Sequence, residues 1–141
     1  MKPDDLLKQI AFIKEIDKLK YIVRKTKLLH SDRPENDAEH SWHLAVMAII
    51  LSEHSNASID VLKVVKMLLI HDIVEIDAGD TFIYDQQKNH DNTAEERKAA
   101  ERIFFFFFQA QALEYIAIWE EFEEKKTDEA KFARAMDRLE P

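Results

Sequence analysis

The sequence contains no cysteine, one glycine and three prolines among its 141 residues. Without cysteine there are neither disulfide bonds nor thiolate metal ligands. The scarcity of glycine and proline leaves few residues for tight turns, and no stretch shows the alternation of apolar and polar residues that is typical of a strand. Residues that favour helices are plentiful: alanine, leucine, isoleucine, glutamate and lysine. We therefore expect an all-α protein with a single domain over residues 1–141.

Long apolar runs and an excess of positive charge are also missing. No stretch of about 18 apolar residues is available to span a bilayer. Asp4, Asp5 and Lys8 lie among the apolar residues of the segment 1–14, which therefore lacks the continuous apolar core of a signal peptide. The 28 acidic residues outnumber the 20 basic ones, and the net charge of −8 repels nucleic acids and anionic membranes. A small phosphorylated ligand is compatible with this charge, because a bound cation and one or two arginines reverse the potential locally. We expect a cytoplasmic protein that binds neither nucleic acid polymers nor membranes.

Apolar residues recur at helical spacing along most of the chain. Asn36, followed three residues later by Glu39, predicts a capping box before a helix that is apolar throughout residues 44–51 and is expected to be buried on all sides. Asp60 is the expected N-cap of the next helix. The expected helices cover residues 6–23, 37–51, 61–76, 94–103, 115–126 and 128–139, with a polar loop over residues 25–37.

Five consecutive phenylalanines, Phe104 to Phe108, form the only low-complexity stretch. Adjacent residues of a helix point in all directions around it, so some of these rings are exposed unless another surface covers them. A helix crossing in the core or a contact between two copies of the chain is the expected explanation, in preference to stacking on a ligand.

Four histidine and aspartate side chains from three expected helices are candidates for one metal site. His40 lies in the first turn of its helix, His71 and Asp72 directly follow an apolar run, and Asp137 lies beside small residues on the last helix. A buried carboxylate costs free energy unless a cation or hydrogen bonds compensate. Mixed imidazole and carboxylate donors suit Mn, Fe, Co, Ni or Zn better than calcium. Since adjacent helical residues diverge by about 100°, the spacing is a weak signal, and a hydrogen-bonded core residue is the alternative for each histidine.

Three segments carry a more specific pattern, and they occur in the order Arg33-Pro-Glu-Asn-Asp-Ala-Glu-His40-Ser, His71-Asp72-Ile-Val-Glu75-Ile-Asp-Ala-Gly79-Asp80 and Ala135-Met-Asp137-Arg-Leu-Glu-Pro141. Together they resemble the motifs of the HD-domain metal phosphohydrolases, and the 5'-deoxynucleotidases are the most similar branch. The resemblance extends from about Leu19 to Pro141. It implies a helical HD domain, commonly homodimeric, with one divalent metal ion per chain. The implied ligands are His40, His71, Asp72 and Asp137, and the metal is Mn, Co, Ni, Fe, Zn or Mg.

The same resemblance implies roles for residues around the metal. Glu75 and Asp80 match acidic residues of the catalytic centre, and Arg24 matches an arginine that contacts phosphate. Arg33 is a further candidate for binding the substrate, with a surface ion pair as its alternative. Glu75 follows His71 by four residues and therefore lies on the same helix face. We expect Glu75 to transfer protons, with Asp80 assisting it or binding the sugar.

The expected function is that of a metal-dependent phosphohydrolase. The leading hypothesis is a 5'-nucleotidase that releases phosphate from (deoxy)nucleoside 5'-monophosphates by attack of a metal-bound hydroxide. A phosphodiesterase or pyrophosphohydrolase of the same fold is an alternative, and so is a helical dimerisation or scaffold protein with a structural metal. Lys25 follows Arg24 where bacterial deoxynucleotidases carry an aromatic residue, so the sugar preference is left open.

Two further expectations concern the ends of the motifs. Relatives continue into additional helices after the position of Pro141, so residues 1–141 are expected to form the HD domain without those C-terminal helices. His43 follows His40 by three residues on the same helix face. We expect it to pack or to support the metal ligands and not to bind the metal itself.

Overall fold

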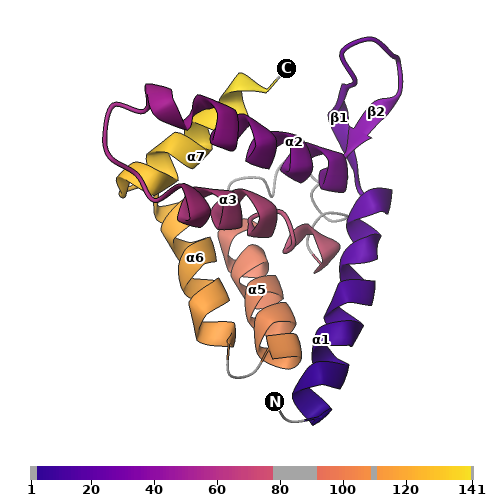
Figure 1. Cartoon of the computed structure of the whole chain (residues 1–141). Coiled ribbons are helices and arrows are strands. Elements are labelled where there is room, and N and C mark those ends of the chain that lie inside the picture. The colour runs from indigo at the N-terminus through magenta and orange to yellow at the C-terminus, as the bar shows by residue number, and fades with distance from the viewer. Residues whose placement is uncertain (1–2, 78–91, 109–110, 141) are drawn as a thin grey trace.

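Helices account for most of the computed structural model, which describes residues 3–77, 92–108 and 111–140 (Figure 1). They are α1 (Pro3–Glu15), α2 (Asp37–Leu51), α3 (Val61–Ile70), α5 (Asn92–Phe108), α6 (Ala112–Glu124) and α7 (Asp128–Leu139), with the 3-10 turns η1 (Ile16–Tyr21) and η2 (Ser52–His54). The strands β1 (Val23–Lys27) and β2 (Pro34–Asn36) form a small hairpin. The expected all-α class is confirmed. None of the described helices is long and apolar enough to cross a membrane.

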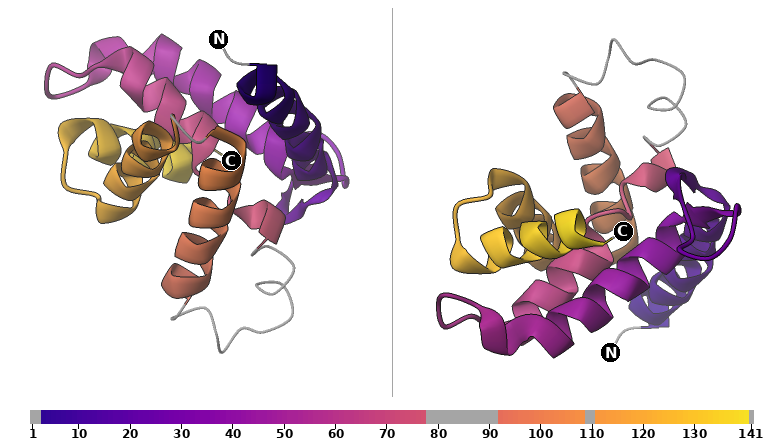
Figure 2. Two further views of the ribbon diagram at one scale, coloured as in Figure 1. Left: turned by 90° about the horizontal axis from the view of Figure 1, so that it is seen from below. Right: turned by 90° about the horizontal axis from the view of Figure 1, so that it is seen from above.

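α3 lies in the middle of the bundle. It packs against α2, α6 and α7, while α5 packs against α6 on one side and α1 on the other. Figure 2 shows that α1 and the hairpin lie at one edge of the molecule and α6 and α7 at the opposite edge. The inner face of α3 follows helical spacing, because Val64, Met67 and Leu68 are fully buried and Leu69 is exposed. The core therefore forms around α3, whose C-terminal end carries His71.

The start of α2 is fixed by the predicted capping box. The side chain of Asn36 accepts a hydrogen bond from the backbone N–H of Glu39 at 2.8 Å, and the Glu39 carboxylate accepts one from the backbone N–H of Asn36 at 2.9 Å. The guanidinium of Arg33 donates two hydrogen bonds to the same carboxylate, at 3.0 and 2.5 Å. These contacts satisfy N–H groups that the first turn leaves free. They place His40 in the first turn of α2.

The polar segment over residues 25–37 contains the expected loop over residues 28–33, but the residues on either side of it form the strands of a hairpin. β1 and β2 pair antiparallel, with Val23 opposite Asn36 and Lys27 opposite Pro34. Most residues of β1 are exposed on both faces, so no alternating pattern marks the strand in the sequence. Backbone hydrogen bonds hold this hairpin without a hydrophobic face, and the expectation of a loop was wrong for residues 25–27 and 34–36.

Three helix expectations also differ from the structure. The first helix ends in η1 at Tyr21, because Val23 begins the strand. The helix expected to reach residue 76 is interrupted after Ile70, where Ile73 and Ile76 donate to carbonyl groups three residues back. α5 extends to Phe108 and not to residue 103. α7, in contrast, has the predicted bounds.

The apolar helix α2 was expected to be buried on all sides and is not. Leu44 and Ala48 are fully buried, whereas Ile49 is 56% and Ile50 is 66% exposed. α2 lies at the edge of the bundle, where its neighbours α3 and α7 cover only part of its circumference. An apolar face of α2 consequently remains exposed in this chain.

The phenylalanine run forms the end of α5. Phe104 is buried, and its ring centroid lies 6.2 Å from that of Tyr115 on α6, whereas Phe105 is exposed. The side chains of residues 106–108 lie outside the described part of the chain, as do Gly79 and the side chain of Thr93. The expected packing in the core therefore holds for Phe104 but not for Phe105.

We predict that Asn36→Ala destabilises the domain by about 1 kcal/mol, because it removes the side-chain acceptor at the N-terminus of α2. Urea denaturation followed by circular dichroism measures the change in the free energy of unfolding. Asn56→Ala, at an exposed position between η2 and α3, is the control and is expected to change stability by less than about 0.5 kcal/mol. Equal stability of both variants would contradict the role of the capping box.

Candidate metal centre

Three of the four predicted metal ligands meet in the interior of the bundle. His40 projects from α2, His71 is the C-cap residue of α3, and Asp72 follows it in the turn after α3. One ligand atom of each residue lies within 4.8 Å of the other two. The two imidazole rings are buried, with their centroids 6.2 Å apart. Residues from separate helices therefore converge as the sequence motifs predicted.

The orientation of His71 is set by the helix that carries it. Its Nδ1 lies 2.7 Å from the carbonyl oxygen of Leu68 and donates to it, because a carbonyl oxygen only accepts. This hydrogen bond leaves Nε2 with the lone pair, and Nε2 lies 3.2 Å from Asp72 Oδ1. A lone pair facing a carboxylate at this distance is repelled unless a proton or a cation lies between them. The geometry thus fits a cation at this position.

The second carboxylate oxygen of Asp72 gives an independent test of whether these residues suit a cation. Asp72 Oδ2 is buried and has no hydrogen-bond partner among the described residues. A buried carboxylate oxygen without a partner costs free energy. Coordination of a divalent cation by Asp72, together with two imidazole nitrogens, removes this cost, and the donor set suits a borderline transition metal.

The fourth predicted ligand, Asp137, lies on α7 next to His40. Its Oδ1 is 2.8 Å from His40 Nε2. Burial disfavours the protonated imidazole of His40, but the hydrogen bond to Asp137 and the nearby carboxylates outweigh burial, so the pKa of His40 is raised. Asp137 therefore contacts the centre through His40, and it is not part of the group in which all ligand atoms lie within 4.8 Å of one another.

Two buried glutamates surround the other nitrogen of His40. Nδ1 lies 3.3 Å from Glu35 Oε1 and is also ion-paired with Glu140. Burial and the hydrogen bond with Glu35 raise the pKa of Glu140. The sequence patterns did not single out Glu140, although it follows Asp137 by three residues and so lies on the same helix face. The three-residue spacing from Asp137 was the one feature of the sequence that could have indicated a role for Glu140 in the site.

Several carboxyl groups near the centre hold protons more tightly than usual. Burial and the charge of Asp72 raise the pKa of Glu75 to about 8 and that of Asp37 to about 7. Burial and the charge of Glu123 raise the pKa of Glu96, on α5, to about 7. Sequence reasoning identified Glu75 but missed Asp37 and Glu96, since their shifts depend on contacts between different segments. Perturbed acids of this kind are typical of functional sites.

The predicted substrate-binding arginines have different environments. Arg24, on β1, has its Nε 3.4 Å from Glu35 Oε1 and is half-buried near His40. Arg33 is exposed and forms its bidentate pair with Glu39. Asp80, the second predicted catalytic acid, lies outside the described residues. Of the two arginines, Arg24 is therefore in contact with the groups around the candidate metal centre.

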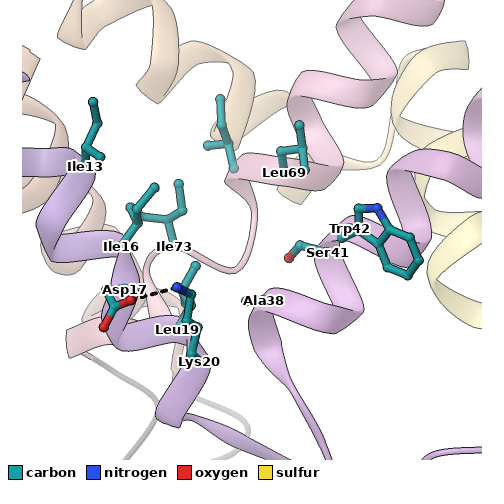
Figure 3. A pocket seen from close by; sticks show the side chains of 11 residues that line it. Ile13, Ile16, Asp17, Leu19, Lys20, Ala38, Ser41, Trp42, Leu69 and Ile73 are labelled. Atoms are coloured by element: carbon teal, nitrogen blue, oxygen red, sulfur yellow. Dashed lines mark ion pairs between the residues drawn. The ribbon is translucent and has the colours of Figure 1, made fainter.

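An apolar groove of about 460 Å³ lies apart from these ligands, between the α1–η1 segment, α2 and the end of α3 (Figure 3). Its wall includes Ile13, Ser41, Trp42 and Leu69, and the ion pair of Lys20 with Asp17, 2.8 Å long, lies at one side. None of the predicted metal ligands lines it. The groove is a separate apolar surface beside α2.

Comparisons with known proteins agree with the fold. Residues 16–141 match the HD-domain family. The crystal structure of a predicted metal-dependent phosphohydrolase from Magnetospirillum magnetotacticum MS-1 has a TM-score of 0.84 and 53% sequence identity, over 96% of this chain and 69% of that one. A conserved hypothetical protein from Pyrococcus furiosus has a TM-score of 0.69 and 28% identity, over 92% of this chain and 78% of that one.

Curated relatives are more distant in sequence. The 5'-deoxynucleotidase HDDC2 of Bos taurus is 26% identical over 133 residues, which cover 93% of this chain and 63% of that protein. HDDC2 of Xenopus laevis is 28% identical over 132 residues, with 93% and 64% covered. The chain therefore spans less than two thirds of the length of these relatives.

We predict that the metal-free protein loses stability as the pH rises from 6 to 8, partly because of Glu75. Its carboxyl group has a pKa of about 8 in the folded chain and an ordinary pKa of about 4.3 when unfolded. The folded state therefore binds the proton more tightly, and the stabilisation present at low pH disappears as the pH passes the folded pKa. Glu75→Gln is expected to remove about 1 to 2 kcal/mol of this dependence.

Thermal denaturation in the presence of a chelator, at pH 6 and pH 8, measures the effect. Glu124→Gln, at an exposed position at the end of α6, is the matched control and is expected to keep the wild-type difference between the two pH values. The same pH dependence in Glu75→Gln and wild type would contradict the shifted pKa.

Proposed function

This chain belongs to the HD-domain family, and we propose that it is a metal-dependent phosphohydrolase that releases phosphate from nucleoside 5'-monophosphates. The observation that carries the proposal is the contact of His71 Nε2 with Asp72 Oδ1 at 3.2 Å, with His40 close to both. Asp72 Oδ2 is buried and has no hydrogen-bond partner among the described residues. The similarity to 5'-deoxynucleotidases, at 24 to 28% identity, supports the substrate class.

His40, His71, Asp72 and Asp137 are the residues that we propose to hold one divalent cation. When bound, such a cation neutralises charge on a phosphoryl oxygen and makes water more acidic. The two imidazoles and two carboxylates admit Mn, Fe, Co, Ni, Zn or Mg, and the identity depends on geometry and availability. Asp137 would bind the cation in place of its hydrogen bond with His40 Nε2.

Glu75 is the group that we assign to proton transfer. It is half-buried in the turn after Asp72, and its raised pKa of about 8 reflects burial and the charge of Asp72. Positive charge beside Asp72 lowers this pKa toward neutrality, where a carboxylate both accepts and donates protons efficiently. Glu75 then takes the proton of the attacking water and returns one to the leaving 5' oxygen. Asp80 is proposed to assist it or to bind the sugar.

Arg24 is the side chain that we assign to the phosphate. Its Nε lies 3.4 Å from Glu35 Oε1, an oxygen that also lies 3.3 Å from His40 Nδ1, so the guanidinium is close to His40. The terminal nitrogens of the guanidinium form a planar fork that suits two phosphate oxygens. The pairing of Arg33 with Glu39 favours a role at the start of α2, and binding of substrate by Arg33 stays a prediction. A cytoplasmic location also stays a prediction.

We predict release of inorganic phosphate from a panel of nucleoside 5'-monophosphates when the chelator-treated protein is supplied with Mn²⁺, Co²⁺ or Mg²⁺. Glu75→Gln is expected to lower kcat by about 10² to 10⁴-fold while cation binding is retained, whereas Asp72→Asn is expected to weaken cation binding itself. Phosphate release and metal affinity are measured on the same preparations, with Glu124→Gln as the control.

Other products would identify the alternatives. Turnover of phosphodiesters or release of pyrophosphate, without free phosphate from monophosphates, would indicate a phosphodiesterase or pyrophosphohydrolase with shared metal chemistry. Cation binding without turnover of any phosphate ester would indicate a structural metal in a scaffold protein. Full activity of Glu75→Gln would contradict its role in proton transfer.

We also propose that the chain forms a homodimer through the exposed apolar face of α2 and α3. The exposed members of this face are Trp42, Val46, Ile49 and Ile50 on α2 and Leu62 and Leu69 on α3. The α2 residues recur at helical spacing on one side, and α2 packs directly against α3. Large exposed apolar faces are typical of protein interfaces. A second copy of the chain carries the same apolar face, so two copies related by a twofold axis would cover each other's exposed residues.

We predict that Ile49→Glu shifts this dimer toward the monomer, because a carboxylate at the centre of the apolar face must be desolvated. The expected loss of dimer stability is at least about 2 kcal/mol, a factor of about 30 in the dissociation constant. Size-exclusion chromatography with light scattering, over a range of concentrations, measures it. Leu113→Glu, on α6 and 70% exposed, is the control. A wild-type chain that is monomeric at every concentration would contradict the proposal.

A further inference from the structure

One turn of α7 contacts His40 from two sides. Asp137 Oδ1 lies 2.8 Å from His40 Nε2, and the Glu140 carboxylate contacts Nδ1 of the same ring, which forms no hydrogen bond of ordinary geometry among the described residues. Glu140 is the C-cap residue of α7, and its backbone N–H donates to the carbonyl group of Met136 at 3.2 Å. Residues three apart lie on one helix face. Both carboxylates therefore reach the imidazole from the same end of α7.

The Glu140 carboxylate is buried with a second carboxylate beside it. The side chains of Glu140 and Glu35 are 4% and 7% exposed. Burial of two carboxylates costs free energy unless each has a polar partner. Glu35 is 3.3 Å from His40 Nδ1 and 3.4 Å from Arg24 Nε, and Glu140 Oε1 is 3.4 Å from His43 Nδ1. The two acids are thus compensated mainly by nitrogen atoms of α2 and β1.

The same atoms also have the composition of a cation site. One ligand atom each from Glu35, His43 and Glu140 lies within 4.8 Å of the others. However, both glutamates already contact His40 Nδ1, and Glu35 contacts Arg24 as well. A cation between these carboxylates would be brought close to the positive guanidinium and would compete with the existing pairs. The contacts favour a role in orienting His40 over the binding of a second metal ion.

We propose that Glu140, supported by Glu35, is a positioning residue that holds the His40 ring with Nδ1–H bonded to carboxylate and Nε2 directed at the cation. The proposal rests on the function proposed above, because it takes His40 as a metal ligand. A carboxylate at Nδ1 fixes the ring orientation, selects the tautomer with the lone pair on Nε2 and makes that nitrogen a stronger donor. α7 thereby supplies one metal ligand, Asp137, and orients another.

Metal affinity of the full chain tests this role without any phosphate ester. The chelator-treated protein is titrated with Mn²⁺ and Zn²⁺ in a calorimeter. Glu140→Ala is expected to bind both cations about 10 to 100-fold more weakly than wild type, as is usual when the partner of a metal-binding histidine is lost. Glu140→Gln keeps an acceptor oxygen for Nδ1–H and is expected to retain affinity within about threefold. Arg138→Ala, exposed in the same turn, is the control and is expected to bind as wild type.

A spectroscopic measurement separates orientation from a general effect on folding. In the Zn²⁺-loaded protein, the imidazole ¹⁵N shifts of His40 are expected to show a protonated Nδ1 and a coordinated Nε2 in wild type and Glu140→Gln. Loss of this pattern in Glu140→Ala, with an unchanged circular dichroism spectrum, supports the proposal. If Glu140→Ala does not fold, the test rests on Glu140→Gln. Wild-type affinity and the wild-type ¹⁵N pattern in Glu140→Gln then support the proposal, and loss of either one contradicts it.

Two results overturn the proposal. One is wild-type affinity in folded Glu140→Ala. The other is a loss of affinity in Glu140→Gln as large as in Glu140→Ala, because charge and not ring orientation would then account for the effect. Turnover is measured separately, so a chain that shows the expected affinities but hydrolyses no phosphate ester refutes the proposed function and leaves this inference intact. A wild-type chain that binds no divalent cation overturns both.

Discussion

The buried contact between His71 and Asp72 is the interaction on which the rest of the structure depends. The hydrogen bond from His71 Nδ1 to the Leu68 carbonyl group directs the lone pair of Nε2 at the Asp72 carboxylate. Two acceptors held face to face in an apolar interior are stable only with positive charge between them. His40 of α2 belongs to the same group of potential ligand atoms, and Asp137 of α7 contacts His40 Nε2 at 2.8 Å. Side chains of α2, α3 and α7 therefore come together at a buried position that requires positive charge.

α3 packs in the core along its length, whereas the turn that follows it carries the polar groups of the candidate site. Its middle turn is fully buried and anchors the core, while the chain directly after Ile70 changes to a turn with hydrogen bonds three residues back. This turn places Asp72 3.2 Å from His71 Nε2 and Glu75 near Asp72, at the cost of crowded carboxyl groups, because burial and the charge of Asp72 raise the pKa of Glu75 to about 8. Apolar contacts such as Phe122 against the His71 ring, at 4.8 Å between centroids, offset part of that cost. The site is thus built where the most stable part of the core ends.

Local signals in the sequence were sufficient for most helices and for the ligand triad. The capping box of Asn36 and Glu39 and the N-cap Asp60 fixed two helix starts, because each depends on residues only three apart. Motif resemblance identified His40, His71 and Asp72, which the structure brings together. Asp37, Glu96 and Glu140 escaped notice, since their burial and shifted pKa values arise from segments distant in the chain. The exposed face of α2 was missed because an all-apolar run does not reveal how many neighbours a helix has.

The unexpected hairpin has a part in the site that explains its presence. Val23 is opposite Asn36 in the antiparallel pair, and the register is irregular between this pair and the pair of Lys27 with Pro34. Arg24 on β1 and Glu35 on β2 follow the Val23–Asn36 pair and contact each other. Arg24 Nε lies 3.4 Å from Glu35 Oε1, which also lies 3.3 Å from His40 Nδ1. Because Asn36 is also the N-cap of α2, the end of β2 and the start of the helix share one anchor. A segment with no hydrophobic face is therefore ordered by its connection to the candidate metal centre, and its strand structure cannot be read from apolar periodicity.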